Sequence, residues 1–223
     1  MIKDRPGDIG LQPDGGAVSG DAAVKQAAAV NFTVKQAFGT LSFFLTCLIM
    51  ALYSVILGGM TQHAIAMLGS LNITDAGLFW SLTLGASVIG RVVFGGLADR
   101  VSKKILILVI WCFHGAGLGT LLYLAGNSSF VWGFVLFYGI ALGSFPTLFP
   151  LFLGEKFGIE HFSKLVGIAG LFQIIGLALG SVLLGRIFDT TGSYYGAVKL
   201  LLIIAAAAFC VTAIIGRPKL KSA

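Results

Sequence analysis

The sequence predicts an all-helical membrane protein whose six transmembrane helices form two inverted repeats of three helices. Three observations support this prediction. Of the 223 residues, 57% are hydrophobic and only 11% are charged, whereas about a quarter of the residues of a soluble domain are charged. Charged residues are absent from the long stretches 36–74, 105–154 and 165–185. Finally, a Gly-x4-Gly-x3-Asp pattern that begins at Gly90 begins again at Gly180.

Six membrane spans follow from the lengths of the apolar stretches. About 20 apolar residues cross the hydrocarbon core of a bilayer, so the stretch 105–154 is long enough for two helices. The apolar runs are continuous and do not alternate with polar residues, which favours helices over a β-barrel. We expect a six-span unit at 38–217, between a cytoplasmic arm (1–37) and a cytoplasmic tail (218–223). The predicted spans lie near residues 41–68, 76–97, 105–124, 130–153, 163–185 and 196–215.

Glycine is abundant within the predicted spans and recurs at a spacing of one helical turn. Gly-x3-Gly pairs begin at Gly115, Gly139 and Gly176. This spacing allows helix backbones to approach closely in a membrane. The pairs therefore predict tight helix packing, without indicating a particular function.

The basic residues orient the spans. With six spans, one side of the membrane receives twelve lysine or arginine residues and the other receives only Arg186 and Lys199. Because positive charge accumulates on the cytoplasmic side, both termini are expected in the cytoplasm. Topology thus accounts for the net charge of +6, and no nucleic-acid partner is expected. The twelve residues are Lys3, Arg5, Lys25, Lys35, Arg100, Lys103, Lys104, Lys156, Lys164, Arg217, Lys219 and Lys221.

The repeated glycine–aspartate pattern lies in the second helix of each predicted set of three. These two helices cross the membrane in opposite directions, which is the arrangement of an inverted-topology repeat. The two copies differ inside the apolar run, where Arg91 stands opposite the neutral Ser181. A single unmatched arginine inside a repeated membrane helix indicates an anion pathway.

Several segments resemble the major facilitator superfamily of transporters. Residues 95–104 (GGLADRVSKK) are similar to that superfamily's loop between the second and third helices of a half, although Ser102 replaces the usual glycine. Residues 139–194 resemble the last three helices of the monocarboxylate-porter and oxalate–formate-antiporter branch. Residues 5–15 (RPGDIGLQPDG) resemble the central cytoplasmic loop of the bacterial members of this branch.

This resemblance implies the carboxy-terminal six-helix half of a twelve-helix transporter. In this superfamily the substrate lies between two halves, so the chain would supply one wall of the pathway. The expected partners are a small-molecule anion, the lipid bilayer, and either a missing amino-terminal six-helix half or a second copy of this chain. The bacterial relatives imply a bacterial cytoplasmic (inner) membrane.

Arg91 is the first candidate for substrate binding. It lies eight residues from Asp99, which corresponds to about 12 Å of helix, and an arginine at such depth costs about 2.5–3.5 kcal/mol on insertion scales. No acidic residue lies within the predicted spans, so the alternative to a substrate anion is an acid of the other half. A planar guanidinium binds a carboxylate through two parallel hydrogen bonds. Monocarboxylate porters carry an arginine here, but Ser87 replaces the aspartate that many of them have one turn earlier.

Gln173 and His63 are further candidates for substrate binding. Oxalate–formate-type antiporters have a lysine at the position that Gln173 matches. With Arg91 as the one cation instead of two, a monoanion is favoured over a dicarboxylate. The alternative is that Gln173 forms hydrogen bonds between helices. His63, near the outer end of the first span, is a candidate outer-gate or proton-relay group; the alternative is an interfacial histidine. His114, in the third span, is expected to be satisfied by neighbouring helices.

The remaining candidates concern gating. Asp99, together with Arg100, Lys103 and Lys104, is expected to hold the cytoplasmic side closed through the positive end of a helix; a loop anchor is the alternative. Pro146 and Pro150 are expected to bend the fourth span.

The sequence therefore predicts alternating-access secondary transport of small organic anions, with monocarboxylates as the expected substrates. The chain contains no P-loop, catalytic triad or cluster with metal-ligand spacing, so neither an enzyme nor a cofactor is expected. The alternative function is a non-transporting truncated remnant or an accessory membrane subunit.

Overall fold

A computed structural model describes residues 31–123, 128–216 and 218 of the chain. Most of the predicted arm (1–37) and all but one residue of the predicted tail lie outside this range. The helical bundle belongs to the compact unit that begins at Phe32. Six of its helical segments are long and apolar enough to cross a membrane, which confirms the all-helical, six-span prediction.

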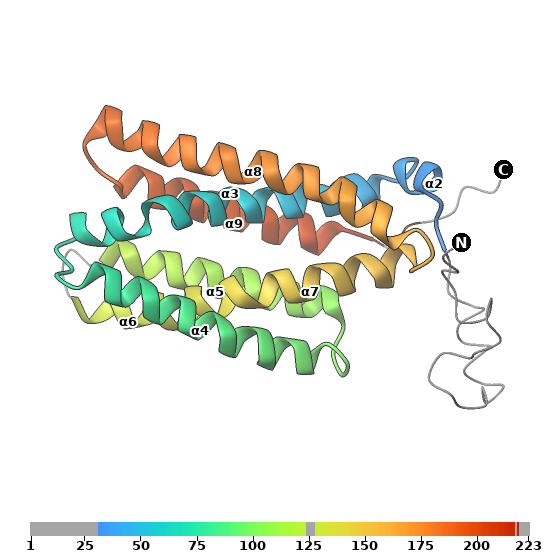
Figure 1. The fold of residues 1–223 in the computed structure, drawn as a ribbon, viewed down its shortest axis with the longest axis horizontal. Coiled ribbons are helices and arrows are strands. Elements are labelled where there is room, and N and C mark those ends of the chain that lie inside the picture. The colour runs from blue at the N-terminus through green and yellow to red at the C-terminus, as the bar shows by residue number, and fades with distance from the viewer. Residues whose placement is uncertain (1–30, 124–127, 217, 219–223) are drawn as a thin grey trace, which may run out of the picture. The chain divides into compact units, whose positions relative to one another are not determined.

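The helices follow one another along the chain with short connections (Figure 1). A short helix, α2, begins with a capping box in which Thr33 and Gln36 satisfy each other's backbone N–H groups. The fourth span combines α6, a π-helical segment at Phe134–Tyr138 and α7. The bounds are α2 Val34–Phe38, α3 Leu41–Ser70, α4 Ala76–Leu97, α5 Lys103–Tyr123, a 3-10 turn Ser128–Phe130, α6 Val131–Gly133, α7 Gly139–Phe157, α8 Phe162–Thr191 and α9 Tyr195–Ile214.

Two of these helices extend beyond the apolar runs that predict them. α8 continues to Thr191 and α7 to Phe157, and each is followed by a glycine with positive φ, Gly192 at 67° and Gly158 at 83°. Glycine adopts this conformation without the steric cost that a Cβ atom imposes. Charge therefore marks where the apolar run ends, whereas glycine marks where the helix ends.

The packing of the bundle follows the inverted repeat. The closest pairs are α3 with α8, α4 with α7, and α5 with α9. Exchanging the first three spans for the last three converts the α3–α8 pair into the α7–α4 pair and leaves the α5–α9 pair unchanged. The secondary contacts, α5 with α7 and α3 with α9, exchange in the same way.

Glycine contacts fix the correspondence between the repeats. A Cβ atom on Gly58 of α3 would strike the Leu177 carbonyl of α8, and one on Gly143 of α7 would strike the Ser87 carbonyl of α4. Each α3 residue therefore corresponds to the α7 residue numbered 85 higher, and each α4 residue to the α8 residue numbered 90 higher.

A second glycine pair gives the same register. A Cβ atom on Gly90 would strike the Ile140 carbonyl, and one on Gly180 would strike the Val55 carbonyl. By contrast, Gly115 faces open space, with nothing within 4 Å of a Cβ atom at that position.

We expect Gly143→Ala to destabilise the bundle by about 1–3 kcal/mol, because the added methyl group would force α7 away from the backbone of α4. The measurement is thermal unfolding in detergent micelles, followed by circular dichroism. Gly115→Ala is the matched control and should leave the unfolding midpoint nearly unchanged. Equal losses in the two variants would contradict the proposed close packing.

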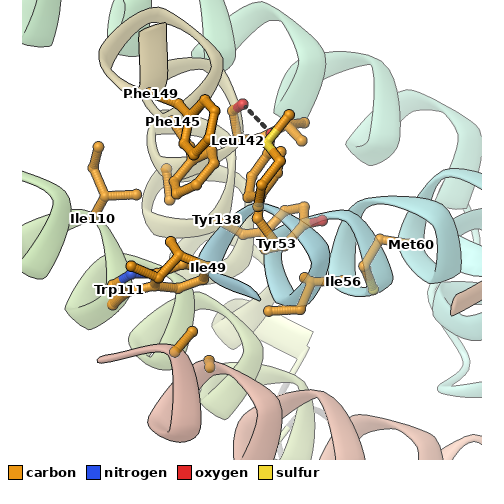
Figure 2. Packing of buried hydrophobic residues seen from close by; sticks show 14 of the residues in the cluster. Ile49, Tyr53, Ile56, Met60, Ile110, Trp111, Tyr138, Leu142, Phe145 and Phe149 are labelled. Atoms are coloured by element: carbon orange, nitrogen blue, oxygen red, sulfur yellow. Dashed lines mark hydrogen bonds between the residues drawn. The ribbon is translucent and has the colours of Figure 1, made fainter. Parts of the chain in front are cut away.

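Aromatic side chains fill the centre of the bundle (Figure 2). Tyr53 of α3 stacks on Phe145 of α7, with ring centroids 4.1 Å apart. Trp111 of α5 donates its indole N–H to the Thr212 hydroxyl of α9 at 3.0 Å. In a bilayer such packing contacts and interhelical hydrogen bonds stabilise a bundle in place of the hydrophobic effect.

Candidate functional site

α4 and α8, the corresponding second helices of the two repeats, carry the two main substrate-binding candidates. Only 22% of the spanning window of each helix is buried, compared with 33–61% for the other four spans. Arg91 lies on α4 and is exposed, and Gln173 lies on α8 and is half-buried. These helices therefore present the largest uncovered surface of the bundle.

Arg91 is exposed on α4. Its neighbour Gly90 lies on the packed face of the helix, directly against α7. Within the described part of the chain, Arg91 forms no ion pair and no hydrogen bond. The guanidinium of Arg91 thus has no protein anion as a partner among the described residues.

A hollow of about 450 Å³ lies between α3 and α8. α3 contributes Leu57, Thr61 and Gln62 to its wall, and α8 contributes Leu177 and Ser181.

In the register of the repeats, these lining positions correspond to Leu142, Pro146 and Thr147 of α7 and to Ser87 and Arg91 of α4. The hollow beside Ser181 is therefore the counterpart of the place where Arg91 stands. The corresponding positions of the two repeats therefore differ in charge, with Arg91 in one and the neutral Ser181 in the other.

The side chain of Gln173 forms no hydrogen bond to any residue in the described ranges. Its amide has both donor and acceptor groups available. Arg91 and Gln173 stand on corresponding helices of the two repeats but at non-corresponding positions, because the counterpart of Gln173 is the buried Thr83.

His63 links three elements near the end of α3. Its Nε2 lies 3.0 Å from the Ser181 carbonyl, and its Nδ1 lies 3.1 Å from the Tyr194 hydroxyl. Because a carbonyl only accepts, Nε2 carries the proton of the first bond. Burial, assisted by the negative charge of Asp189, raises the pKa of Tyr194, so its hydroxyl keeps its proton. Both ring nitrogens are thus used to hold α3 against α8 and the start of α9.

The predicted gating residues separate into two groups. Asp99 and Arg100 are exposed after the end of α4. Lys103 pairs with Glu155 at 3.4 Å, which joins the start of α5 to the end of α7.

Lys104 belongs to a cluster around the end of α9. Its Nζ donates to the carbonyls of Ala213 and Ile215 at 2.8 and 2.9 Å, and Lys156 Nζ donates to the Gly216 carbonyl at 2.7 Å. The last carbonyls of a helix lack intrahelical donors and carry its negative partial charge. Lys104 of α5 and Lys156 of α7 therefore supply hydrogen-bond donors to the carbonyls at the end of α9.

Lys104→Met should lower the free energy of unfolding by about 1–2 kcal/mol, because two carbonyls at the end of α9 would lose a charged donor. Lys164→Met, which removes an exposed lysine at the start of α8, serves as the control and should have little effect. Thermal unfolding in micelles measures both variants. An equal response would show that the Lys104 contacts contribute no specific stability.

Pro146 creates a hydrogen-bond acceptor inside α7. Proline has no N–H, so the carbonyl of Leu142, four residues earlier, loses its normal helical donor. The Tyr53 hydroxyl of α3 donates to this carbonyl at 3.0 Å, as the dashed line in Figure 2 shows. The helix continues through Pro146 and Pro150 to Phe157.

Two buried polar groups at the centre were not anticipated. His114 donates Nδ1–H to the Ile110 carbonyl at 3.1 Å, but its Nε2 has no partner among the described residues. The expectation that neighbouring helices satisfy His114 is therefore wrong for this atom, because the surrounding groups are the rings of Tyr53, Trp111 and Tyr138. The Tyr138 hydroxyl likewise has no partner in the described part of the chain.

The comparisons with known proteins identify relatives, although no family model matches the chain. It is 30% identical to mouse protein spinster homolog 3 over 57% of this chain and 25% of that protein. It is 26% identical to human monocarboxylate transporter 12 over 65% of this chain and 26% of that protein. An uncharacterized MFS-type transporter of Escherichia coli, YhjX, is 24% identical over 62% of this chain and 33% of that protein. The matches thus span between a quarter and a third of these relatives.

Proposed function

Because this chain is related to the transporters of the major facilitator superfamily and has the six-helix architecture of one half of such a protein, we propose that it forms one wall of a transmembrane pathway for small organic anions. Transport proceeds by alternating access between this bundle and a second one. Arg91 binds the substrate anion.

The observation that carries this proposal is that Arg91 lies within a membrane span and has no anionic partner among the described residues. An arginine at membrane depth without a partner is expensive, and Arg91 has no protein anion among the described residues. A substrate carboxylate supplies the missing charge and matches the two parallel N–H groups of the guanidinium.

A monocarboxylate is the proposed substrate class. Arg91 supplies one cation, and the resemblance to oxalate–formate-type antiporters puts Gln173 at the position where those proteins have a lysine as a second cation. The relative named as a monocarboxylate transporter supports the same class. Because Ser87 is neutral, proton coupling through an acid next to Arg91 is not part of this proposal.

A second six-helix bundle covers α4 and α8 in this proposal. It is either joined to this chain or supplied by another copy, and it encloses a watery route past Arg91. The Ser42 hydroxyl donates to the Gly216 carbonyl, so the start of α3 and the end of α9 lie at the same end of the bundle. The positive-inside rule favours a cytoplasmic location for this end.

The test uses a single cysteine one turn from Arg91. Val88→Cys, in a background where Cys47, Cys112 and Cys210 are serine, should react with a water-soluble thiol reagent in proteoliposomes of the intact protein. Lactate should slow the reaction at least twofold, because a bound carboxylate occupies the space beside the probe. Lack of protection by lactate, acetate, formate and oxalate alike would overturn the anion assignment.

Two controls define the origin of the protection. Addition of Arg91→Gln should remove it, because the anion would lose its ligand. Ile203→Cys, on an exposed face of α9, should show no lactate effect.

A further inference from the structure

The inverted repeat makes Tyr53 and Tyr138 corresponding residues. Tyr53 lies on α3, and Tyr138 immediately precedes α7, numbered 85 higher, in the register that Gly58 and Gly143 define. Both rings are buried, and both stand edge-on to the same histidine, His114. Their centroids lie 5.8 and 5.5 Å from the His114 ring, each at an interplanar angle of 88°. The two tyrosines therefore contact His114 with nearly equal geometry.

The hydrogen bonds of the two tyrosines break this symmetry. The Tyr53 hydroxyl donates to the Leu142 carbonyl of α7. The corresponding acceptor for Tyr138 is the Leu57 carbonyl of α3, but the Tyr138 hydroxyl has no partner among the described residues. A buried hydroxyl without a partner is energetically unfavourable.

The backbone is asymmetric at the same place. Tyr138 ends the π-helical segment Phe134–Tyr138, whereas Tyr53 lies within the regular helix α3. π-helical turns are rare and often occur at functional positions. Conversion of this segment to α-helix would rotate Tyr138 relative to α3, so the position of its hydroxyl depends on a local rearrangement.

The Leu57 carbonyl of α3 is the acceptor that this second bond would use. Leu57 is partly buried and lines the hollow between α3 and α8. Its carbonyl has a helical donor at Thr61, where Leu142 instead has Pro146, but an sp² oxygen accepts a second hydrogen bond. The Leu57 bond would thus be weaker than the Leu142 bond, so the conformation described here is the favoured one.

We propose that Tyr53 and Tyr138 form a two-position hydrogen-bond switch between the inverted repeats. In the conformation described here, the Tyr53 hydroxyl donates a hydrogen bond to the Leu142 carbonyl, and the Tyr138 hydroxyl has no partner among the described residues. In the opposite-facing conformation, Tyr138 donates to the Leu57 carbonyl, and Tyr53 leaves Leu142. The inference rests on the proposed function in one respect, since it assumes that the bundle alternates between two conformations.

The test compares Tyr53→Phe and Tyr138→Phe with a probe of conformation that does not require transport. Gln62→Cys, exposed at the hollow between α3 and α8, is placed in the cysteine-free background of the intact protein in proteoliposomes. Its rate of reaction with a maleimide applied to both sides reports how often the hollow is open.

The two variants should change this rate in opposite directions, each by about fivefold, because each removes the hydrogen bond of a different conformation. The double variant should return toward the parent rate. Changes in the same direction, or an unchanged rate in Tyr138→Phe, would overturn the switch.

Two measurements distinguish failure of the switch from instability of a variant and from failure of the proposed anion binding. Tyr138→Phe removes only a hydroxyl that has no described partner, so its unfolding temperature should not fall, and the variant remains interpretable if Tyr53→Phe is unstable. The thiol readout does not depend on an anion. Opposite rate changes without lactate protection at Val88→Cys would therefore refute the proposed function while supporting the switch.

Discussion

Arg91→Gln is expected to raise the monocarboxylate concentration for half-maximal uptake by at least thirtyfold, or to abolish uptake. Loss of one partner of a hydrogen-bonded charge pair costs about 2–5 kcal/mol, which corresponds to about 30-fold or more in affinity. Arg91→Lys should keep part of the affinity, since it preserves the charge but not the paired N–H geometry. Uptake of radiolabelled lactate by the intact protein in proteoliposomes measures both variants.

The control for Arg91 is Arg186→Gln. Arg186 is also exposed, near the end of α8, but it does not line the hollow between α3 and α8. Its replacement should leave the half-maximal concentration within about twofold of the parent value. Unchanged substrate affinity in Arg91→Gln and Arg91→Lys would remove Arg91 from the substrate site.

Tyr53→Phe should destabilise the bundle by about 1–3 kcal/mol, because it leaves the buried Leu142 carbonyl without the donor that replaces the one lost at Pro146. Pro146→Ala restores a backbone N–H at that position. In the Pro146→Ala background, the loss caused by Tyr53→Phe should fall to less than half. Thermal unfolding of the four members of this double-mutant cycle measures the coupling.

The cycle includes its own control. Pro146 is exposed, so alanine fits there without steric conflict and should not disturb the ring stacking of Tyr53 on Phe145. If Tyr53→Phe costs the same with proline and with alanine at position 146, the tyrosine does not substitute for the missing helical donor.

The sequence predicted the fold because its signals are local. Long uncharged runs predict spans, and the patterns at Gly90 and Gly180 predicted the inverted repeat that the helix contacts show. The Gly-x3-Gly spacing was less informative. The pairs beginning at Gly139 and Gly176 lie in close helix contacts, whereas Gly115 faces open space, since spacing alone does not tell which face of a helix meets another helix.

The candidate site was less predictable, because its contacts join distant parts of the chain. Arg91 stands out from the sequence by its charge at membrane depth, and its role remains a prediction. The partners of Lys104 are main-chain carbonyls more than 100 positions away, and those carbonyls have no sequence signature. The Tyr53 bond to Leu142 spans 89 positions. One signal for it was present, since a proline inside an apolar helix always leaves a carbonyl four residues earlier in need of a donor.

The lysine contacts at the end of α9 have a consequence for sequence variation. Lys104 and Lys156 donate hydrogen bonds to main-chain oxygens. These bonds therefore do not constrain which side chains stand at the end of α9. A mutational scan should therefore find the exposed positions 213, 214 and 216 tolerant of substitution and positions 104 and 156 intolerant. Selection therefore acts on the two lysines that donate the hydrogen bonds, and not on the side chains of the residues whose carbonyls accept them.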